Sequence, residues 1–198
     1  TLRIGFVSAV LATALGTLAA VALTRSGRFA GRRLFTGIIY APLVMPEVIT
    51  GLSLLLLFVA TNAERGFWTV TIAHTTVTMS FVTVVVQSRL LSFDRSLEEA
   101  AMDLGANELT TFRKVTLPLI APAILAGGLL SFALSIDDFV ITYFNAGSNV
   151  TFPIFVWGSA QRGVPPQVNV FGTVIFVVAL TLMVVNVLYQ RRREGQAA

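Results

Sequence analysis

Five long apolar segments, separated by shorter polar connections, dominate the pattern of the chain. They cover residues 4–24, 35–60, 67–88, 121–144 and 168–189. A helix needs about 20 predominantly apolar residues to cross about 30 Å of hydrocarbon, and each segment is near that length or longer. The pattern therefore predicts an all-α fold, a polytopic membrane helix bundle with five spans in this chain.

Basic residues gather at alternate ends of these segments. One side carries Arg25, Arg28, Arg32, Arg33, Arg89, Arg95, Arg113, Lys114, Arg191, Arg192 and Arg193, and the other carries Arg3, Arg65 and Arg162. Loops rich in Lys and Arg are expected on the cytoplasmic side. The C-terminus is therefore predicted in the cytoplasm and Thr1 outside.

Composition agrees with a membrane protein. Hydrophobic residues make up 55% of the chain and charged residues 12%, with a net charge of +4. A soluble domain carries roughly 25% charged residues. The basic residues lie at the ends of apolar segments, where membrane topology explains them, so nucleic acid is not expected as a partner. There is no cysteine and His74 is the single histidine, so no metal site is expected.

Small residues recur every four positions along two of the segments. They are Ser8, Ala12, Gly16, Ala20 and Thr24 in the first and Gly127, Ser131 and Ser135 in the fourth. Such faces let helix backbones approach closely in lipid. Helix packing is the favoured interpretation, ahead of direct contact with a substrate.

A polar block, EEAAMDLGANELTTFRKVTLP at residues 98–118, interrupts the hydrocarbon pattern. Ser96 and Glu99 fit a capping box that would start a helix at Leu97. Gly105 suits the left-handed residue that ends it, and Asn107 suits the cap of a second helix. Pro118 is expected to stop that helix after residue 116. The block predicts a cytoplasmic helix-turn-helix within a coupling loop at residues 89–120.

The loop has the features of a protein-docking segment. Apolar side chains at Leu97, Leu104, Leu109 and Phe112 suit a helix laid into a cleft. A helix that rests on lipid headgroups is usually rich in Lys and Arg on its polar face. The first helix instead carries Glu98, Glu99 and Asp103. Protein docking is therefore favoured over a membrane-surface role.

The spacing EAA–x3–G–x9–V–x–LP resembles the EAA loop of ABC importer permeases. The matching residues are Glu99, Ala100, Ala101, Gly105, Val115, Leu117 and Pro118, with Val115 where isoleucine is common. SLEEAAMDLGA, VTLPLIAPAILAGGLLSFALSIDDFV and APLVMPEVITGLSLLL resemble the spermidine/putrescine branch of that family. The resemblance covers essentially the whole chain and implies that those seven residues form the coupling surface for an ATPase.

The resemblance also implies the assembly. It predicts that residues 1–198 form a single transmembrane permease domain of a bacterial inner membrane, and that one further helix precedes Thr1, making six in the complete protein. The implied partners are an ABC ATPase subunit, a second permease subunit and a periplasmic solute-binding protein. ATP and Mg²⁺ would be used by the ATPase, and no cofactor is expected on this chain. The sequence agrees, since its single lysine, Lys114, follows no phosphate-binding glycine-rich turn.

Three acidic residues, Glu47, Asp137 and Asp138, fall within the apolar segments. A carboxylate inside a bilayer is costly and is expected to face protein or water. No basic residue in the five segments is placed to neutralise them, so they are candidates for a path that carries a cationic substrate.

The geometry of the three acids leaves alternatives open. Adjacent residues of a continuous helix point about 100° apart. Asp138 is therefore expected near the face that carries the small residues Gly127, Ser131 and Ser135, and Asp137 to one side of that face. Asp138 would then lie either at a subunit seam or on the path. The alternative for the two aspartates is a hydrogen-bonding role at the helix end, near the outer surface. Glu47 follows Pro42 and Pro46, which predict a broken helix. It would either line the path or, protonated, bond a freed carbonyl. His74 is assigned a packing or hydrogen-bonding role.

The favoured function is a non-catalytic permease subunit of an ATP-driven polyamine importer. One alternative is an ABC permease for another small solute, and another is an ion-coupled secondary transporter working alone. A membrane-embedded enzyme is disfavoured, because one histidine, one lysine and no cysteine make a catalytic constellation hard to assemble.

Overall fold

The computed structural model describes the chain except for residues 28, 164–165, 175, 179 and 182–198. Its described residues contain helices and no strand, in agreement with the predicted all-α class. The chain divides into two compact units, Thr1–Ile154 and Phe155–Ala198.

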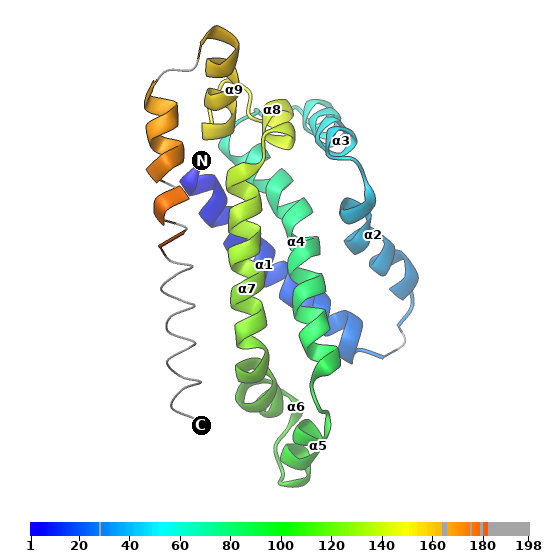
Figure 1. The fold of residues 1–198 in the computed structure, drawn as a ribbon. Helices are drawn as coiled ribbons and strands as arrows, with labels where there is room; N and C mark the ends of the chain where they lie inside the picture. The colour runs from blue at the N-terminus through cyan, green and yellow to red at the C-terminus, as the bar shows by residue number, and fades with distance from the viewer. Residues whose placement is uncertain (28, 164–165, 175, 179, 182–198) are drawn as a thin grey trace. The chain divides into compact units, whose positions relative to one another are not determined.

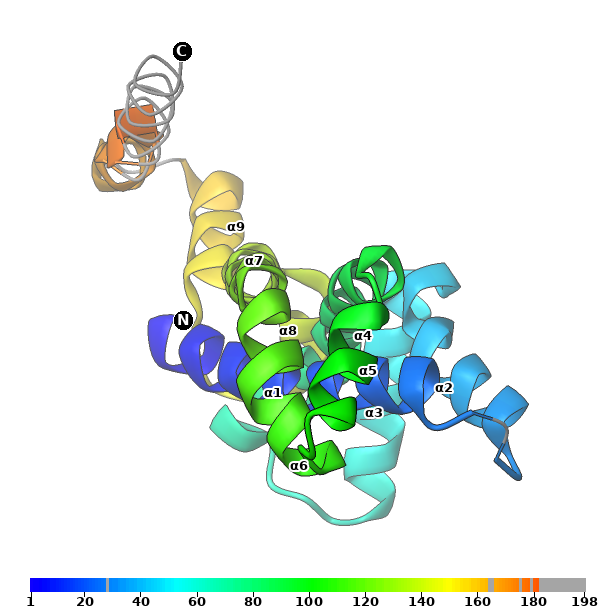
Figure 2. The same ribbon diagram turned by 90° about the horizontal axis from the view of Figure 1, so that it is seen from below.

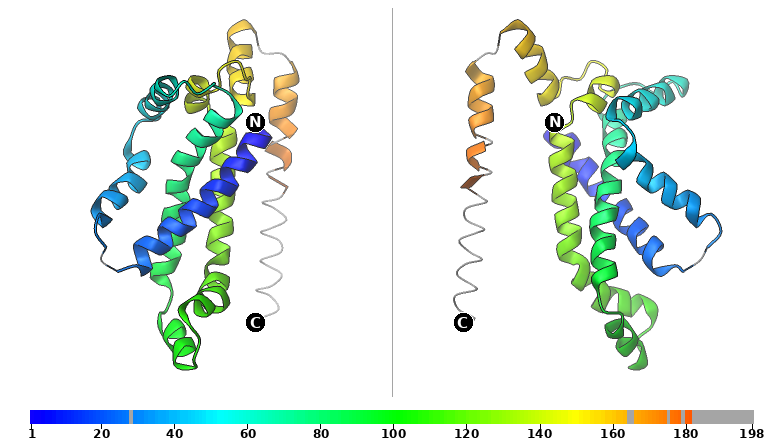
Figure 3. Two further views of the ribbon diagram at one scale, coloured as in Figure 1. Left: turned by 180° about the vertical axis from the view of Figure 1, so that it is seen from behind. Right: turned by 45° about the vertical axis from the view of Figure 1, so that its right-hand side comes forward.

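Three helices form the centre of the first unit: α1 (Leu2–Arg25), α4 (Phe67–Ser92) and α7 (Leu117–Asp137). Each packs against the other two (Figures 1 and 3). A Cβ at Gly16 would lie 2.7 Å from Met79 O, and one at Gly127 would lie 3.2 Å from Val82, so both glycines permit close approach. The packing role predicted for the two small-residue faces is confirmed.

The predicted span at residues 35–60 is two helices, α2 (Arg32–Val44) and α3 (Glu47–Ala60), bent by 118°. The bend follows from Pro46, because a residue before proline avoids helical geometry and Met45 is extended at φ −74°, ψ 136°. Asn145 fastens α3 to α8 (Val140–Asn145), since its Nδ2 donates to Gly51 O at 3.2 Å and to Ile141 O at 2.9 Å.

Two short helices, α5 (Ser96–Asp103) and α6 (Glu108–Thr111), lie at the end of the bundle opposite α3 and α8 (Figures 1 and 3). Figure 2, seen from that end, shows them in front of α4 and α7. A π-helical segment, η1 (Phe112–Thr116), joins α6 directly to α7.

The expectation that Pro118 ends the second loop helix is therefore wrong. Residues Glu108–Asp137 form one apolar run of helix. The wider π turn, in which Leu117 N donates to Phe112 O, precedes Pro118, and Pro118 falls in the first turn of α7, where a missing N–H is tolerated.

In the part of the chain that the structure describes, fewer helices are able to cross a membrane than the five predicted. Within the described residues, α1, α4 and Glu108–Asp137 are long and apolar enough to cross a membrane, and the bent α2–α3 pair makes up to four. The predicted span at residues 168–189 lies partly outside the described residues. The second unit contains most of α9 (Phe152–Arg162) and an apolar helix at Pro166–Val178.

Candidate functional site

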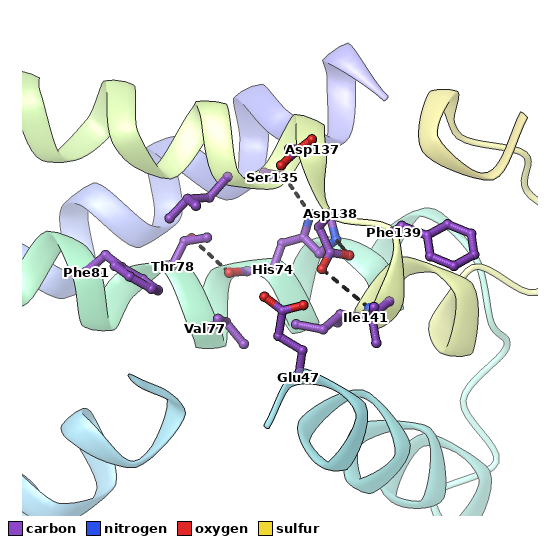
Figure 4. A pocket seen from close by; sticks show the side chains of 12 residues that line it. Glu47, His74, Val77, Thr78, Phe81, Ser135, Asp137, Asp138, Phe139 and Ile141 are labelled. Atoms are coloured by element: carbon purple, nitrogen blue, oxygen red, sulfur yellow. Dashed lines mark hydrogen bonds and ion pairs between the residues drawn. The ribbon is translucent and has the colours of Figure 1, made fainter. Parts of the chain in front are cut away.

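A cavity of about 240 Å³ lies between α3, α4, α7 and α8 (Figure 4). Its lining residues are Glu47, His74, Val77, Thr78, Phe81, Leu134, Ser135, Asp137, Asp138, Phe139, Val140 and Ile141. All three predicted acids of the substrate path are among them. They come from positions 47 and 137–138, far apart in the chain, and the fold brings them to one place.

Two helix breaks put the acids there. Glu47 is the first residue of α3, directly after the bend at Pro46. Asp137 is the last residue of α7, and Asp138 leaves the helix with φ −62°, ψ 118°. The predicted continuous helix over residues 121–144 is therefore wrong at this point. Because the backbone turns at Asp138, both aspartates reach one cavity, which a regular helix would not allow.

Asp138 is held by the protein around it. Its Oδ2 accepts hydrogen bonds from Thr142 N at 2.7 Å and Thr142 Oγ1 at 2.8 Å, and it lies 3.1 Å from His74 Nε2. The side chain of Asp138 thereby bonds the first turn of α8, one residue before its N-cap Phe139, which favours a new helix start after the interruption. The Asp138 side chain is 12% exposed.

His74 is the buried centre of this network. It is 2% exposed, and its Nδ1 lies 2.6 Å from Ser135 Oγ. An ionised carboxylate only accepts hydrogen bonds, so the proton between His74 and Asp138 is assigned to Nε2. The hydrogen-bonding role predicted for His74 is confirmed. The expectation that no basic side chain accompanies the acids is corrected, because His74 in α4 contacts Asp138 in the α7–α8 break.

Glu47 and Asp137 differ from Asp138. Both are exposed, and neither makes a hydrogen bond or ion pair with the described part of the chain. They line the cavity as acceptor-only groups, which suits a ligand that carries ammonium or other N–H donors. Among the described residues, no group of three or more His, Cys, Asp or Glu side chains is placed to hold a metal ion.

The loop at the other end of the bundle has a turn built as predicted. Gly105 has φ +88°, and Ala106 N donates to Ala101 O at 3.1 Å, which satisfies a carbonyl at the end of α5. Asn107 Oδ1 accepts from Thr110 N at 2.8 Å, so the predicted cap of the second helix is confirmed. The glycine supplies a backbone conformation that other residues rarely adopt.

The predicted capping box at Ser96 and Glu99 is wrong. The N-cap of α5 is Arg95, without a side-chain cap, and Asp94 Oδ1 accepts from Ser96 N at 3.0 Å. Asp94 precedes the helix by two residues and takes the donor that the capping box would have used. The backbone N–H of Ser96 holds the pKa of Asp94 below its usual value.

The seven residues of the EAA motif lie in α5, in the turn after it, in η1 and at the start of α7. Glu99, Ala100, Gly105, Leu117 and Pro118 are exposed, while Ala101 and Val115 are half-buried. Exposed apolar side chains accompany them, at Leu97, Met102, Leu104 and Leu109. Leu104 is 90% exposed. The expected anchor at Phe112 is half-buried instead, because it lies in the π segment next to α7.

Comparison with known proteins identifies the family. Residues 12–193 match the family described as the binding-protein-dependent transport system inner membrane component. The chain belongs to this family. The predicted resemblance is thereby confirmed.

Named members of the family are similar over most of the chain. The putrescine transport system permease protein PotI of Escherichia coli is 51% identical over 181 residues, covering 88% of this chain and 64% of PotI. The spermidine/putrescine transport system permease protein PotC of Haemophilus influenzae is 40% identical over 192 residues, covering 96% of this chain and 74% of PotC. The chain thus spans less than two thirds of the length of PotI.

A solved structure shares the fold of this family member. It is an inward-facing conformation of the MetNI methionine ABC transporter, with a TM-score of 0.74 and 21% identity. The match covers 91% of this chain and 86% of the other.

Sequence reasoning missed two residues that hold the site together. Asn145 fixes α8 to α3, and Thr142 holds Asp138. Both are polar residues in an apolar segment, a signal of internal hydrogen bonding, but their partners lie on a separate helix or across a break that the pattern does not reveal.

Proposed function

We propose that this chain is the transmembrane permease subunit of an ATP-driven, binding-protein-dependent importer that carries polyamine cations across a bacterial inner membrane. The names of its relatives support the cargo class, since PotI and PotC are described as putrescine and spermidine/putrescine permeases. Membership of the family supports the type of transporter.

The observation that carries this proposal is the acidic cavity. Glu47 and Asp137 are exposed carboxylates at two helix breaks, in a protein whose surroundings are mostly hydrocarbon. Carboxylates within membrane helices are rare and mark a water-filled path or a site for a cation. A polyamine supplies ammonium groups that would pair with them, and the cavity would give the cation a polar resting point along the path.

The loop between α4 and α7 would face the cytoplasm and bind the ABC ATPase. Its exposed residues Glu99, Ala100 and Gly105, with Leu104 projecting from the turn, supply the charge and apolar contact expected of a docking surface. The basic residues at this end of the bundle favour the same orientation, with the C-terminus cytoplasmic. ATP and Mg²⁺ would be handled by the partner.

Transport would follow from two arrangements of the complex. A second permease subunit would complete the path, and a periplasmic binding protein would deliver the cation on the outer side. The ATPase can drive the cycle only if its two nucleotide states contact the loop differently in the two arrangements. At the proposed outer end of the bundle the helices are interrupted, between α2 and α3 and between α7 and α8, rather than straight.

Uptake of radiolabelled putrescine and spermidine tests the proposal. The complete protein would be expressed with its ATPase, partner permease and binding protein in a strain that lacks its own polyamine importers. ATP-dependent accumulation that is lost in Glu47→Gln/Asp137→Asn supports the function. Glu64→Gln, an exposed glutamate between α3 and α4, is the matched control. Full uptake by the double variant would reject the cation path.

A further inference from the structure

Glu98 is the least exposed acid in the loop between α4 and α7. Its side chain is 13% exposed. The other acids of the loop are exposed, and they are Asp94, Glu99, Asp103 and Glu108. Glu98 Oε1 lies 3.1 Å from Arg25 Nη2 and accepts a hydrogen bond of 2.6 Å from Thr116 Oγ1. One carboxylate oxygen therefore contacts two other parts of the chain.

These contacts join three elements. Arg25 is the last residue of α1, Glu98 lies in α5, and Thr116 is the last residue of η1, which continues into α7. Beyond this, α5 packs mainly against α6 and η1. Within the described residues, Glu98 is the one side chain of α5 in an ion pair, and the Ser96 side chain bonds Asp94 directly before the helix. We call Arg25, Glu98 and Thr116 the Glu98 junction.

Arg25 is committed to this junction. Its side chain is 17% exposed, and its guanidinium lies 5.7 Å from the ring centroid of the buried Phe93. A cation over an aromatic face is attracted to it. The Arg25–Glu98 contact is an ion pair without hydrogen-bond geometry, and Arg25 Nε and Nη2 are buried without an acceptor in the described part of the chain. These two N–H groups of Arg25 are therefore available to hydrogen-bond if the Glu98 carboxylate moves closer.

Thr116 places the junction at an irregular part of the helix. Its side chain is 2% exposed and it ends the π segment between α6 and α7. Single π turns are less regular than α turns and are frequent at functional sites. A displacement of α5 would therefore act on the base of α7 through its π turn, and on α1 through its terminal arginine.

We infer that Glu98 is a positioning residue that transmits movement of the loop to α1 and α7 together. The inference rests on the proposed function, in which the loop binds an ATPase. The exposed face of α5 contacts the ATPase, and the Glu98 carboxylate on the other side carries the displacement into the membrane helices. The two neighbouring glutamates thus have different roles, because Glu99 faces the partner ATPase and Glu98 faces the helix bundle.

The test separates association from coupling in the reconstituted transporter. Glu98→Ala removes both contacts, and Glu98→Gln keeps an acceptor for Thr116 while removing the charge that pairs with Arg25. Both variants should co-purify with the ATPase, but stimulation of ATP hydrolysis by the loaded binding protein should fall about tenfold in Glu98→Ala and less in Glu98→Gln. The exchange Arg25→Glu/Glu98→Arg should restore part of the stimulation. Glu64→Gln should behave as the unsubstituted protein.

The outcomes separate the two proposals. If the unsubstituted chain binds no ATPase, the proposed function fails. If it binds the ATPase and couples normally but Glu98→Ala couples equally well, the inference about Glu98 fails alone. If Glu98→Ala loses ATPase binding in proportion to its loss of coupling, Glu98 is a structural residue of the docking surface and the inference is again rejected.

A distance measurement gives a readout that a purely structural role would not change. The chain has no cysteine, so spin labels can be placed at Ser26→Cys and Arg95→Cys, which are exposed and flank the junction on α1 and α5. In the unsubstituted complex this distance should be the same with and without ATP, because the two elements move together. In Glu98→Gln it should differ between the two states. An ATP-dependent distance in the unsubstituted complex would overturn the inference.

Discussion

Two adjacent pairs of acids, at opposite ends of the bundle, follow the same rule. In Asp137–Asp138, the second member is held by His74 and Thr142 while the first is exposed in the cavity. In Glu98–Glu99, the first member is held by Arg25 and Thr116 while the second is exposed on α5. The order of the members is reversed, but each pair has one bound carboxylate and one exposed carboxylate.

The difference within each pair separates structure from interaction. A carboxylate whose acceptors are filled by the protein fixes the local backbone, and its removal leaves donors without partners. An exposed carboxylate contributes little to folding, because surface charges are well solvated. We therefore expect the bound members to affect stability or coupling, and the exposed members to affect contact with a cargo or a partner.

The largest effect is expected at the exposed member of the loop pair. Glu99→Lys reverses a charge on the surface proposed to bind the ATPase and should abolish co-purification of the ATPase. The amount of protein in the membrane should stay within about twofold of the unsubstituted level, because surface substitutions usually change stability by no more than about 0.5 kcal/mol. Retention of the ATPase by this variant would remove Glu99 from the docking surface.

The bound member of the cavity pair should affect stability. Asp138→Asn weakens charge-assisted hydrogen bonds to Thr142 and His74, each worth about 1.5–3 kcal/mol. We expect a lower thermal midpoint for the detergent-solubilised protein, measured by intrinsic fluorescence. Asp137→Asn should leave the midpoint within error. Equal midpoints for the two variants would contradict the division between bound and exposed members.

Substitution of His74, the partner of Asp138, tests the same comparison between the bound and the exposed acid. His74→Ala removes the donor to Asp138 and leaves Ser135 without its partner, so the thermal midpoint should fall by at least as much as in Asp138→Asn. In the double variant His74→Ala/Asp138→Asn the two losses should add only in part, because both substitutions remove the same His74–Asp138 contact. Fully additive losses, measured in the same melting assay, would mean that the two residues act independently.

The smallest effect is expected at the turn of the loop. Gly105→Ala meets no nearby atom, but it places a side chain at φ +88°, which costs about 1 kcal/mol. ATPase affinity, measured by titration of the purified permease, should fall by about fivefold. Gly158→Ala, at a glycine in α9 with open space around it and no positive φ, is the control. Unchanged affinity in Gly105→Ala would show that docking tolerates distortion of the turn.

The sequence predicted the helical class, the break near Pro46 and the turn at Gly105, because these follow from local rules about apolar length, proline and glycine. It also located the acids that line the cavity. It did not predict the break at Asp138, since the apolar pattern runs on unchanged through residues 139–144 and the cause is a hydrogen bond to Thr142.

Long-range partners were beyond the sequence for a different reason. Arg25 and Glu98 are 73 positions apart, and Asn145 bonds Gly51 from 94 positions away. Their pairing depends on how α1 meets α5 and how α3 packs on α8, which no local pattern encodes. The apparent capping box at Ser96 failed because Asp94, two residues earlier, competes for the same donor.

One measurement tests the central claim, that the exposed member of the cavity pair, Asp137, serves the cargo and its bound neighbour, Asp138, serves the fold. The apparent KM for putrescine uptake would be compared between Asp137→Asn and Asp138→Asn, each normalised to the amount of assembled transporter. We predict a KM raised about tenfold in Asp137→Asn, as expected for the loss of one desolvated ion pair, and by no more than about twofold in Asp138→Asn. A KM raised as much in Asp138→Asn as in Asp137→Asn would contradict the account.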